Sequence, residues 1–187
     1  MSTLTVNTIN ETTAANGVVI DGLKVKDYSL MYGSNIGLTI DSSGRTTQPN
    51  QPAFSVKKST TQSSLAHNTY VDITLDSELF DRGSNFASNT FTAPVTGLYQ
   101  LNANIQLLAV DNGANFYQLQ IVTSNRSYPL NIEPDFSGDA DYWMVHFVVL
   151  ADMDASDTAK LDYYQGGGTT GHTNVSSHTY FSGFLVA

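Results

Sequence analysis

The amino-acid sequence predicts an all-β protein, built as a jelly-roll sandwich that follows a short β-rich stalk. Several segments alternate apolar and polar residues with a period of two, and none shows helical periodicity of useful length. Aromatic residues make up 11% of the chain and charged residues only 13%, while Thr, Ser, Asn and Gly are abundant. Such a composition favours strands joined by tight turns. The 187 residues are enough for one core domain and a modest appendage.

Residues 1–50 form the predicted stalk, because their apolar patches are short and are separated by Gly, Asn and Asp. The segment Gly17-Val18-Val19-Ile20-Asp21 recurs as Gly37-Leu38-Thr39-Ile40-Asp41, at a period of 20 residues. A strand-and-turn unit of this kind buries its apolar face by stacking or by wrapping around sister chains. We therefore expect that the stalk does not fold alone. Two prolines in Gln48-Pro49-Asn50-Gln51-Pro52 mark the boundary with a knob at residues 51–187.

The clearest strand of the knob is predicted at Leu98–Leu108. One face of this segment carries Tyr99, Leu101, Ala103, Ile105 and Leu107, and the other carries Gln100, Asn102, Asn104 and Gln106. Burial is worth roughly 1.5 to 3 kcal/mol for each large apolar side chain, so this is expected to be a core strand. Shorter strands are expected at Phe54–Lys57, Tyr70–Leu75, Phe116–Thr123 and Ala159–Gln165.

Two further strands, Tyr142–Leu150 and Tyr180–Val186, are apolar on both faces. A strand in a two-sheet sandwich places one face in its own core, so a second apolar face needs another cover. A partner subunit would provide that cover. The candidate residues of this subunit interface are Tyr142, Met144, Val148, Tyr180, Phe184 and Val186.

Three motifs in residues 52–187 resemble the signature of complement component 1q globular heads. They are Phe80-Asp81-Arg82-Gly83-Ser84-Asn85-Phe86, Phe91-Thr92-Ala93-Pro94-Val95-Thr96-Gly97-Leu98-Tyr99, and the ending Phe181-Ser182-Gly183-Phe184-Leu185. The resemblance implies a ten-stranded jelly roll of the complement 1q and tumour necrosis factor type. It also implies a homotrimer, with the C-terminal strand near the threefold axis. Residues 1–50 contain no Gly-X-Y repeat, so the partners of collagen-linked animal members are not expected.

Two stretches of the stalk, Ser2–Ile9 and Gly17–Lys26, are similar to the N-terminal parts of bacteriophage fibre and other virion structural proteins. This second resemblance implies a non-enzymatic virion protein that is assembled in the host cytoplasm. Its residues 1–50 would bind other virion proteins, and its knob would bind a host-surface glycan or protein, or stabilise the particle. The first residues lack the basic and apolar blocks of a signal peptide, which agrees with assembly inside the host.

Two other functions remain open at this point. One is a secreted or surface-displayed bacterial recognition module of the complement 1q type, exported without an N-terminal signal. The other is a glycan-cleaving enzyme carried on a fibre, for which the sequence offers no recognisable catalytic pair.

The glycine-rich segment Gly166–His172 and the side chains around it provide the candidate receptor site, formed by Tyr163, Tyr164, His172 and Tyr180. Tyrosines on a mobile polar loop bind sugars or protein epitopes through their rings and hydroxyls. An ordinary surface hairpin is the alternative interpretation.

A loop that contains Glu133, Asp135, Asp139 and Asp141 has the oxygen ligands for a calcium cofactor. A solvated acidic turn is the alternative. The cluster Asp152, Asp154 and Asp157 is expected to serve turn chemistry. His146 or His178, if it lay on a threefold axis, would present three imidazoles to a metal ion.

The composition argues against other partners. The net charge of −9 disfavours binding to phosphate backbones, and no basic cluster offsets it. The absence of cysteine excludes disulfides and thiolate metal sites. No segment approaches the roughly 18 apolar residues of a membrane span, so membrane insertion is not expected.

Overall fold

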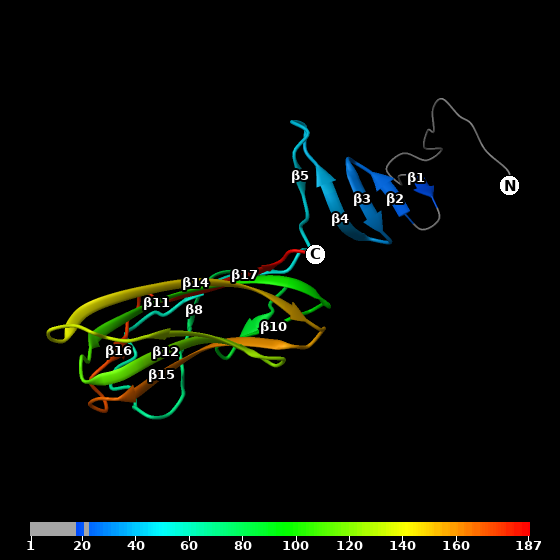
Figure 1. The fold of residues 1–187 in the computed structure, drawn as a ribbon. Helices are drawn as coiled ribbons and strands as arrows, with labels where there is room; N and C mark the ends of the chain where they lie inside the picture. Colours follow the sequence, from blue (N-terminus) through cyan, green and yellow to red (C-terminus); the bar gives the residue numbers. More distant parts are fainter. Residues whose placement is uncertain (1–17, 21–22) are drawn as a thin grey trace. The chain divides into compact units, whose positions relative to one another are not determined.

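In a computed structural model, residues 18–20 and 23–187 are described, and they contain strands, turns and irregular segments. The chain divides into two compact units, Met1–Gln51 and Pro52–Ala187 (Figure 1). None of the described residues belongs to a helix long and apolar enough to cross a membrane.

The N-terminal unit contains one five-stranded antiparallel sheet, in which the strands follow one another in chain order. These strands are β1 (Val18–Ile20), β2 (Leu23–Lys26), β3 (Ser29–Tyr32), β4 (Asn35–Ile40) and β5 (Thr46–Thr47). The first copy of the predicted repeat contributes β1 and the second ends β4, although Gly17 and Asp21 lie outside the described residues.

This sheet is a single layer that buries little of its own apolar surface. Within residues 23–51, Ser29 is the one fully buried residue. Large apolar side chains of the unit are between 38% and 79% exposed, namely Leu23, Val25, Tyr28, Leu30, Tyr32 and Ile40. A sheet without a covering layer is marginally stable in water. The short apolar patches of the sequence therefore have no core of their own within this part of the chain.

The C-terminal unit is a sandwich of two sheets, which Figure 1 shows as two layers. One sheet has the order β13-β12-β15-β10-β9, with β7 paired to β15, and the other has the order β14-β11-β17-β6-β8, with β16 paired to β11. Strands of the first sheet are β7 (Val71–Asp72), β9 (Phe86–Ala87), β10 (Thr90–Thr92), β12 (Ala114–Thr123), β13 (Ser127–Ile132) and β15 (Thr158–Gly167). Strands of the second are β6 (Ala53–Lys57), β8 (Ser77–Arg82), β11 (Gly97–Val110), β14 (Ala140–Met153), β16 (Asn174–Val175) and β17 (Tyr180–Leu185). We call these the β12 sheet and the β14 sheet.

The core lies between these two sheets and confirms the predicted sandwich. All five apolar residues predicted to share the inner face of the Leu98–Leu108 strand are inaccessible to solvent, namely Tyr99, Leu101, Ala103, Ile105 and Leu107. The β12 sheet faces them with Tyr117, Leu119, Ile121 and Tyr163, which are equally buried. Side chains that alternate along each strand thus fill the space between the layers.

A turn between β10 and β11 fixes the start of the core strand. The hydroxyl of Tyr99 donates a hydrogen bond to the carbonyl oxygen of Val95 at 2.8 Å. A Cβ added to Gly97 would lie 2.5 Å from the carbonyl oxygen of Ala187, so the glycine permits the chain end to pass close beside β11. The motif from Phe91 to Tyr99 therefore brings the start of β11 next to the C-terminal residue Ala187.

Several strands differ from the sequence prediction, since β8, β9, β10 and β16 were not expected. The predicted strand Tyr70–Leu75 is reduced to β7 at Val71–Asp72, and β13 at Ser127–Ile132 was not expected. β13 contains Pro129, which lies opposite Gln120 of β12. Since β13 pairs with β12 alone, it is an edge strand, where proline is tolerated because no ladder hydrogen bond is needed on its free side.

Candidate functional site

The outer face of the β14 sheet is apolar over most of β14. Tyr142 is 71% exposed, Met144 46%, Val148 47% and Leu150 56%, while their neighbours Trp143, Val145, Phe147 and Val149 turn toward the core. The strand is therefore apolar on both sides, as predicted. Its outer side chains have no cover within the described part of the chain.

Further exposed apolar side chains of the β14 sheet lie on β17, and the polar outer face of β11 separates them from those of β14. Leu150 lies opposite Gln100 of β11, which lies opposite Phe184 of β17. Phe184 is 40% exposed, and Val186, just beyond β17, is 46% exposed. Tyr180, at the start of β17, is partly exposed beside Asn104. The six predicted interface residues thus belong to β14, β17 and the chain immediately after β17.

A shallow hollow of about 560 Å³ lies on the same sheet, where Phe80 and Arg82 of β8 approach Asn102 and Phe184. Phe80 is 52% exposed. The sequence did not indicate Phe80 as part of this surface, because β8 reaches it only through its register with β6. The name apolar face is used below for Tyr142, Met144, Val148, Leu150, Phe184 and Phe80.

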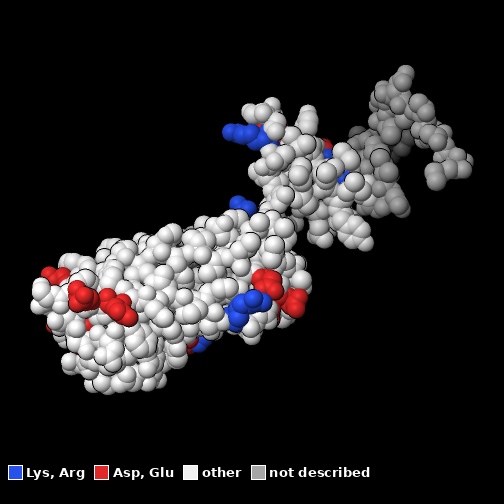
Figure 2. Space-filling view, viewed as in Figure 1, with Lys and Arg blue, Asp and Glu red and all other residues white. Residues whose placement is uncertain are grey.

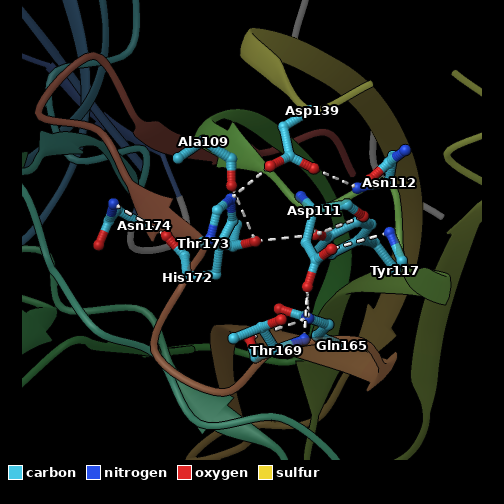
Figure 3. Close-up of polar contacts among 11 residues, drawn as sticks. Ala109, Asp111, Asn112, Tyr117, Asp139, Gln165, Thr169, His172, Thr173 and Asn174 are labelled. Atoms are coloured by element: carbon cyan, nitrogen blue, oxygen red, sulfur yellow. Dashed lines mark hydrogen bonds and ion pairs between the residues drawn. The ribbon is translucent and has the colours of Figure 1, made fainter. Parts of the chain in front are cut away.

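Charged groups cover little of the C-terminal unit in the view of Figure 2, and carboxylates gather toward its ends. One of these ends contains a polar network centred on Asp111, which Figure 3 shows. Asp111 is 5% exposed, and its carboxylate accepts hydrogen bonds from the backbone N–H of Thr169 and of Gly113. Gln165 Nε2 donates to the same carboxylate at 3.4 Å. The network joins the β11–β12 turn to the glycine-rich loop after β15.

The electrostatics of this network favour the ionised carboxylate. Burial opposes the charge of Asp111, but the N–H groups of Thr169 and Gly113 and the nearby His172 outweigh it and hold the pKa of this carboxyl below its usual value. A phenol completes the network, because Tyr117 Oη accepts from the N–H of Asp111 at 2.8 Å and lies 2.7 Å from Thr173 Oγ1. Burial raises the pKa of Tyr117.

The glycine-rich loop is therefore tied down on several sides. Gly167, Gly168 and Gly171 have φ of 73° each, which suits glycine. His67 Nδ1 lies 3.0 Å from the carbonyl oxygen of Gly168, and Asn68 Oδ1 accepts from the N–H of Gly167 at 2.9 Å. The segment expected to be a mobile polar loop has a defined set of hydrogen-bond partners.

The structure does not bring Glu133, Asp135, Asp139 and Asp141 together in the arrangement of a calcium site. Within the described residues, no group of three or more His, Asp or Glu side chains is placed to hold a metal ion. Asp139 is engaged elsewhere, since its carboxylate accepts from the N–H of Asn112 at 3.0 Å. Its other oxygen lies 3.2 Å from His172 Nε2, without the alignment of a hydrogen bond. The carboxylate of Asp139 is thus engaged by Asn112 and His172 and not by the other acidic residues of the loop.

The cluster at Asp152, Asp154 and Asp157 has the predicted turn chemistry. Asp157 accepts from the hydroxyl of Ser124 at 2.7 Å and from the N–H of Asp154 at 2.8 Å. These bonds, with that of Ser124 the largest, hold the pKa of Asp157 below its usual value.

The structure separates the four candidate receptor-binding residues. Tyr163 is a correction, because it is fully buried and donates its hydroxyl to Gln165 Oε1 at 2.8 Å inside the core. Tyr180 lies on the β14 sheet, and His172 belongs to the network around Asp111. Tyr164 alone among the four contributes to an exposed aromatic group on the outer face of the β12 sheet. Alternation along β15 separates Tyr163 from Tyr164, and this signal was available in the sequence.

A charged cluster lies next to Tyr164 on the same sheet. Lys160 Nζ lies 2.5 Å from Asp72 Oδ1 and 3.2 Å from Asp162 Oδ1, although the Asp162 contact is not aligned as a hydrogen bond. Burial raises the pKa of Asp162, and the bond from Lys160 lowers the pKa of Asp72. Because a lysine bridges the two carboxylates, this arrangement resembles a structural ion pair and not a carboxylate pair that flanks a substrate.

The arrangement of strands in the C-terminal unit matches a solved structure. The globular domain of zebrafish complement 1qA is 20% identical in sequence, and the match covers 73% of this chain and 98% of that domain with a TM-score of 0.53. The C-terminal unit has the fold of a complement 1q globular domain. Murine APRIL is 10% identical, with 73% of this chain and 99% of that chain covered, at a TM-score of 0.49. No family model matches the sequence, and no curated protein is similar to it.

Proposed function

We propose that this protein is a non-enzymatic, homotrimeric structural protein of a bacteriophage virion. In this proposal residues 1–50 attach the subunit to other virion proteins, and residues 51–187 form a knob that binds the host surface or stabilises the particle. The apolar face carries the proposal of self-association, because six large apolar side chains, each at least 40% exposed, gather on one sheet. An exposed patch of this kind on a folded domain marks an interaction surface.

The N-terminal unit supports an attachment role. Its single sheet exposes most of its apolar side chains, and sister copies or other virion proteins would supply the missing layer. The similarity of Ser2–Ile9 and Gly17–Lys26 to phage virion proteins favours a virion as the larger assembly. All of the first segment and part of the second lie outside the described residues, so this support comes from sequence.

A second function fits the fold equally well. A bacterial recognition module of the complement 1q type would use the same C-terminal unit, and the match to the zebrafish domain favours it as much as a knob. The two functions differ in where the protein is found.

Two measurements test the proposal. Light scattering coupled to size-exclusion chromatography of the full chain, at micromolar concentration, should give a mass three times 20.2 kDa. A stable single-chain species contradicts the trimer. Isotope-labelled mass spectrometry of purified virions should detect the chain in the particle. Detection in particle-free culture supernatant, together with absence from virions, favours the recognition module instead.

A further inference from the structure

The outer face of the β12 sheet contains a groove on the opposite side of the sandwich from the apolar face. A hollow of about 540 Å³ is lined there by Phe116, Gln118, Asn131 and Glu133, which come from β12, β13 and the residue just after β13. Ligand pockets in proteins commonly have volumes of about 300 to 1,000 Å³. We call these four residues with Tyr164 and Tyr70 the aromatic groove.

The register of the sheet explains why these residues meet. Gln118 lies opposite Tyr164 on one side and opposite Asn131 on the other, so that the three side chains form one row across β15, β12 and β13. Hydrogen bonds connect the row, because Tyr70 Oη donates to Gln118 Oε1 and Gln118 Nε2 donates to Asn131 Oδ1 at 2.8 Å. The amide group of Gln118 is thereby fixed in one orientation.

The aromatic side of the groove is held in place by ring contacts and by a glycine. The rings of Phe116 and Tyr164 are stacked with centroids 5.6 Å apart, and the ring of Tyr70 lies 4.9 Å from that of Tyr164. A Cβ on Gly166 would lie 2.5 Å from Phe116 Cε1, so the Phe116 ring rests directly on the backbone of β15. The absence of a side chain at Gly166 thus allows Phe116 to reach Tyr164.

The polar side of the groove has free hydrogen-bonding capacity. Among the described residues, no hydrogen bond is made by Asn131 Nδ2 or by the Glu133 carboxylate, and both residues are exposed. A primary amide supplies donors and a carboxylate accepts only, so together they match a pair of neighbouring hydroxyl groups. No lysine or arginine lines the hollow, and the chain has a net charge of −9. An anionic ligand is therefore disfavoured.

We propose that the aromatic groove binds a neutral saccharide. The apolar face of a pyranose ring packs against Phe116 or Tyr164, while its hydroxyl groups bond to Asn131 and Glu133. This arrangement combines an apolar surface with a few well-placed polar groups, as ligand sites in proteins do. The inference rests on the recognition role proposed for the knob, but it requires neither the trimer nor the virion.

Saturation-transfer NMR of the full chain tests this inference. The probes are the methyl glycosides of glucose, galactose, mannose, N-acetylglucosamine and N-acetylgalactosamine, with methyl glucuronide as the anionic comparison. At least one neutral glycoside should receive saturation and the glucuronide should receive none. Saturation of the glucuronide alone, or of no probe at all, overturns the proposal.

Variants of the groove locate the site. Tyr164→Ala and Asn131→Ala should each raise the Kd of the bound glycoside at least tenfold, and Tyr32→Ala, which removes an exposed tyrosine of the N-terminal unit, should leave it unchanged. If Tyr164→Ala does not fold, Glu133→Gln serves as the second variant, because Glu133 is exposed and its replacement should keep the fold. A Kd that is unchanged in both Glu133→Gln and Asn131→Ala also overturns the assignment. If a single-chain species binds the glycoside, the proposed trimer is contradicted and the proposed saccharide site is supported. If a trimer forms but binds no glycoside, the trimer is supported and the saccharide site is contradicted.

Discussion

Replacement of Val148 by aspartate should dissociate the proposed trimer. Val148 is 47% exposed, so about half of its side chain remains to be covered by a sister copy. Complete burial of a valine contributes roughly 1.5 to 3 kcal/mol, which leaves about 1 kcal/mol for this half. The substitution occurs three times in a trimer, so about 3 kcal/mol of apolar burial is lost. Every 1.4 kcal/mol changes an association constant about tenfold, so the loss exceeds roughly 100-fold. A carboxylate placed against apolar groups weakens association further.

The assay is sedimentation velocity of the full chain over a range from about 1 to 100 µM, because a 100-fold change in the association constant of a trimer moves its midpoint concentration about tenfold. Val95→Asp is the matched control, because Val95 is 44% exposed and lies in the turn between β10 and β11. It introduces the same charge at a valine of similar exposure outside the apolar face. Its expected mass is that of the unchanged protein.

Two results would refute this reasoning. If Val148→Asp keeps the sedimentation coefficient of the parent protein at the lowest concentration, Val148 does not lie in a subunit interface. If Val95→Asp dissociates as readily as Val148→Asp, added charge and not the apolar face governs association. Thermal melts of both variants show whether a decrease in the mass of the assembly results from unfolding of the subunit.

Three further changes test other parts of the structure. Asp111→Asn should cost roughly 1.5 to 3 kcal/mol at pH 7, because the ionised carboxylate holds several donors. Folding lowers the pKa of Asp111, so the stabilisation from its carboxylate is complete above the unfolded value of about 3.9 and is lost as the pH falls through the folded pKa. The free energies of unfolding of the parent and of Asp111→Asn, measured by urea titration, should therefore converge in acid. Gly166→Ala should displace the Phe116 ring at a cost of about 1 to 3 kcal/mol and should weaken glycoside binding. Gly138→Ala is the control, because nothing lies within 4 Å of the added carbon, and it should have the melting temperature and the glycoside Kd of the parent. Tyr99→Phe removes a 2.8 Å hydrogen bond and should cost about 1 kcal/mol in urea denaturation.

Local alternation in the sequence predicted the parts of the fold that depend on one strand at a time. The faces of Leu98–Leu108 followed from a period of two, and the buried side chains confirm them. The same pattern separates Tyr163 from Tyr164, since Leu161 and Tyr163 share the inner face while Lys160 and Asp162 share the outer face with Tyr164. Tyr163 precedes the glycine-rich loop by three residues, but the alternation of β15 places it inside the core.

Features that depend on pairing between strands were not accessible from one sequence. The groove brings Phe116 and Asn131 together through the register of β12 with β13, and β13 itself was missed because Pro129 interrupts its pattern. Asp111 likewise meets Thr169 only because two turns lie at the same end of the sandwich. The acidic loop looked like a calcium site because spacing alone does not show that Asp139 turns toward Asn112.

The two outer faces of the sandwich differ in chemistry, and this difference determines how the two proposals fit together. The β14 sheet presents the apolar face, while the β12 sheet presents the charged cluster at Lys160 and the aromatic groove. If the first sheet faces sister copies, the groove on the opposite sheet stays accessible in every subunit. Three such sites in one trimer would bind a repeating glycan with an avidity that can exceed the affinity of each site by about 100-fold or more. A shallow site that is weak in the single chain is therefore sufficient for attachment, provided that the three copies engage the same surface.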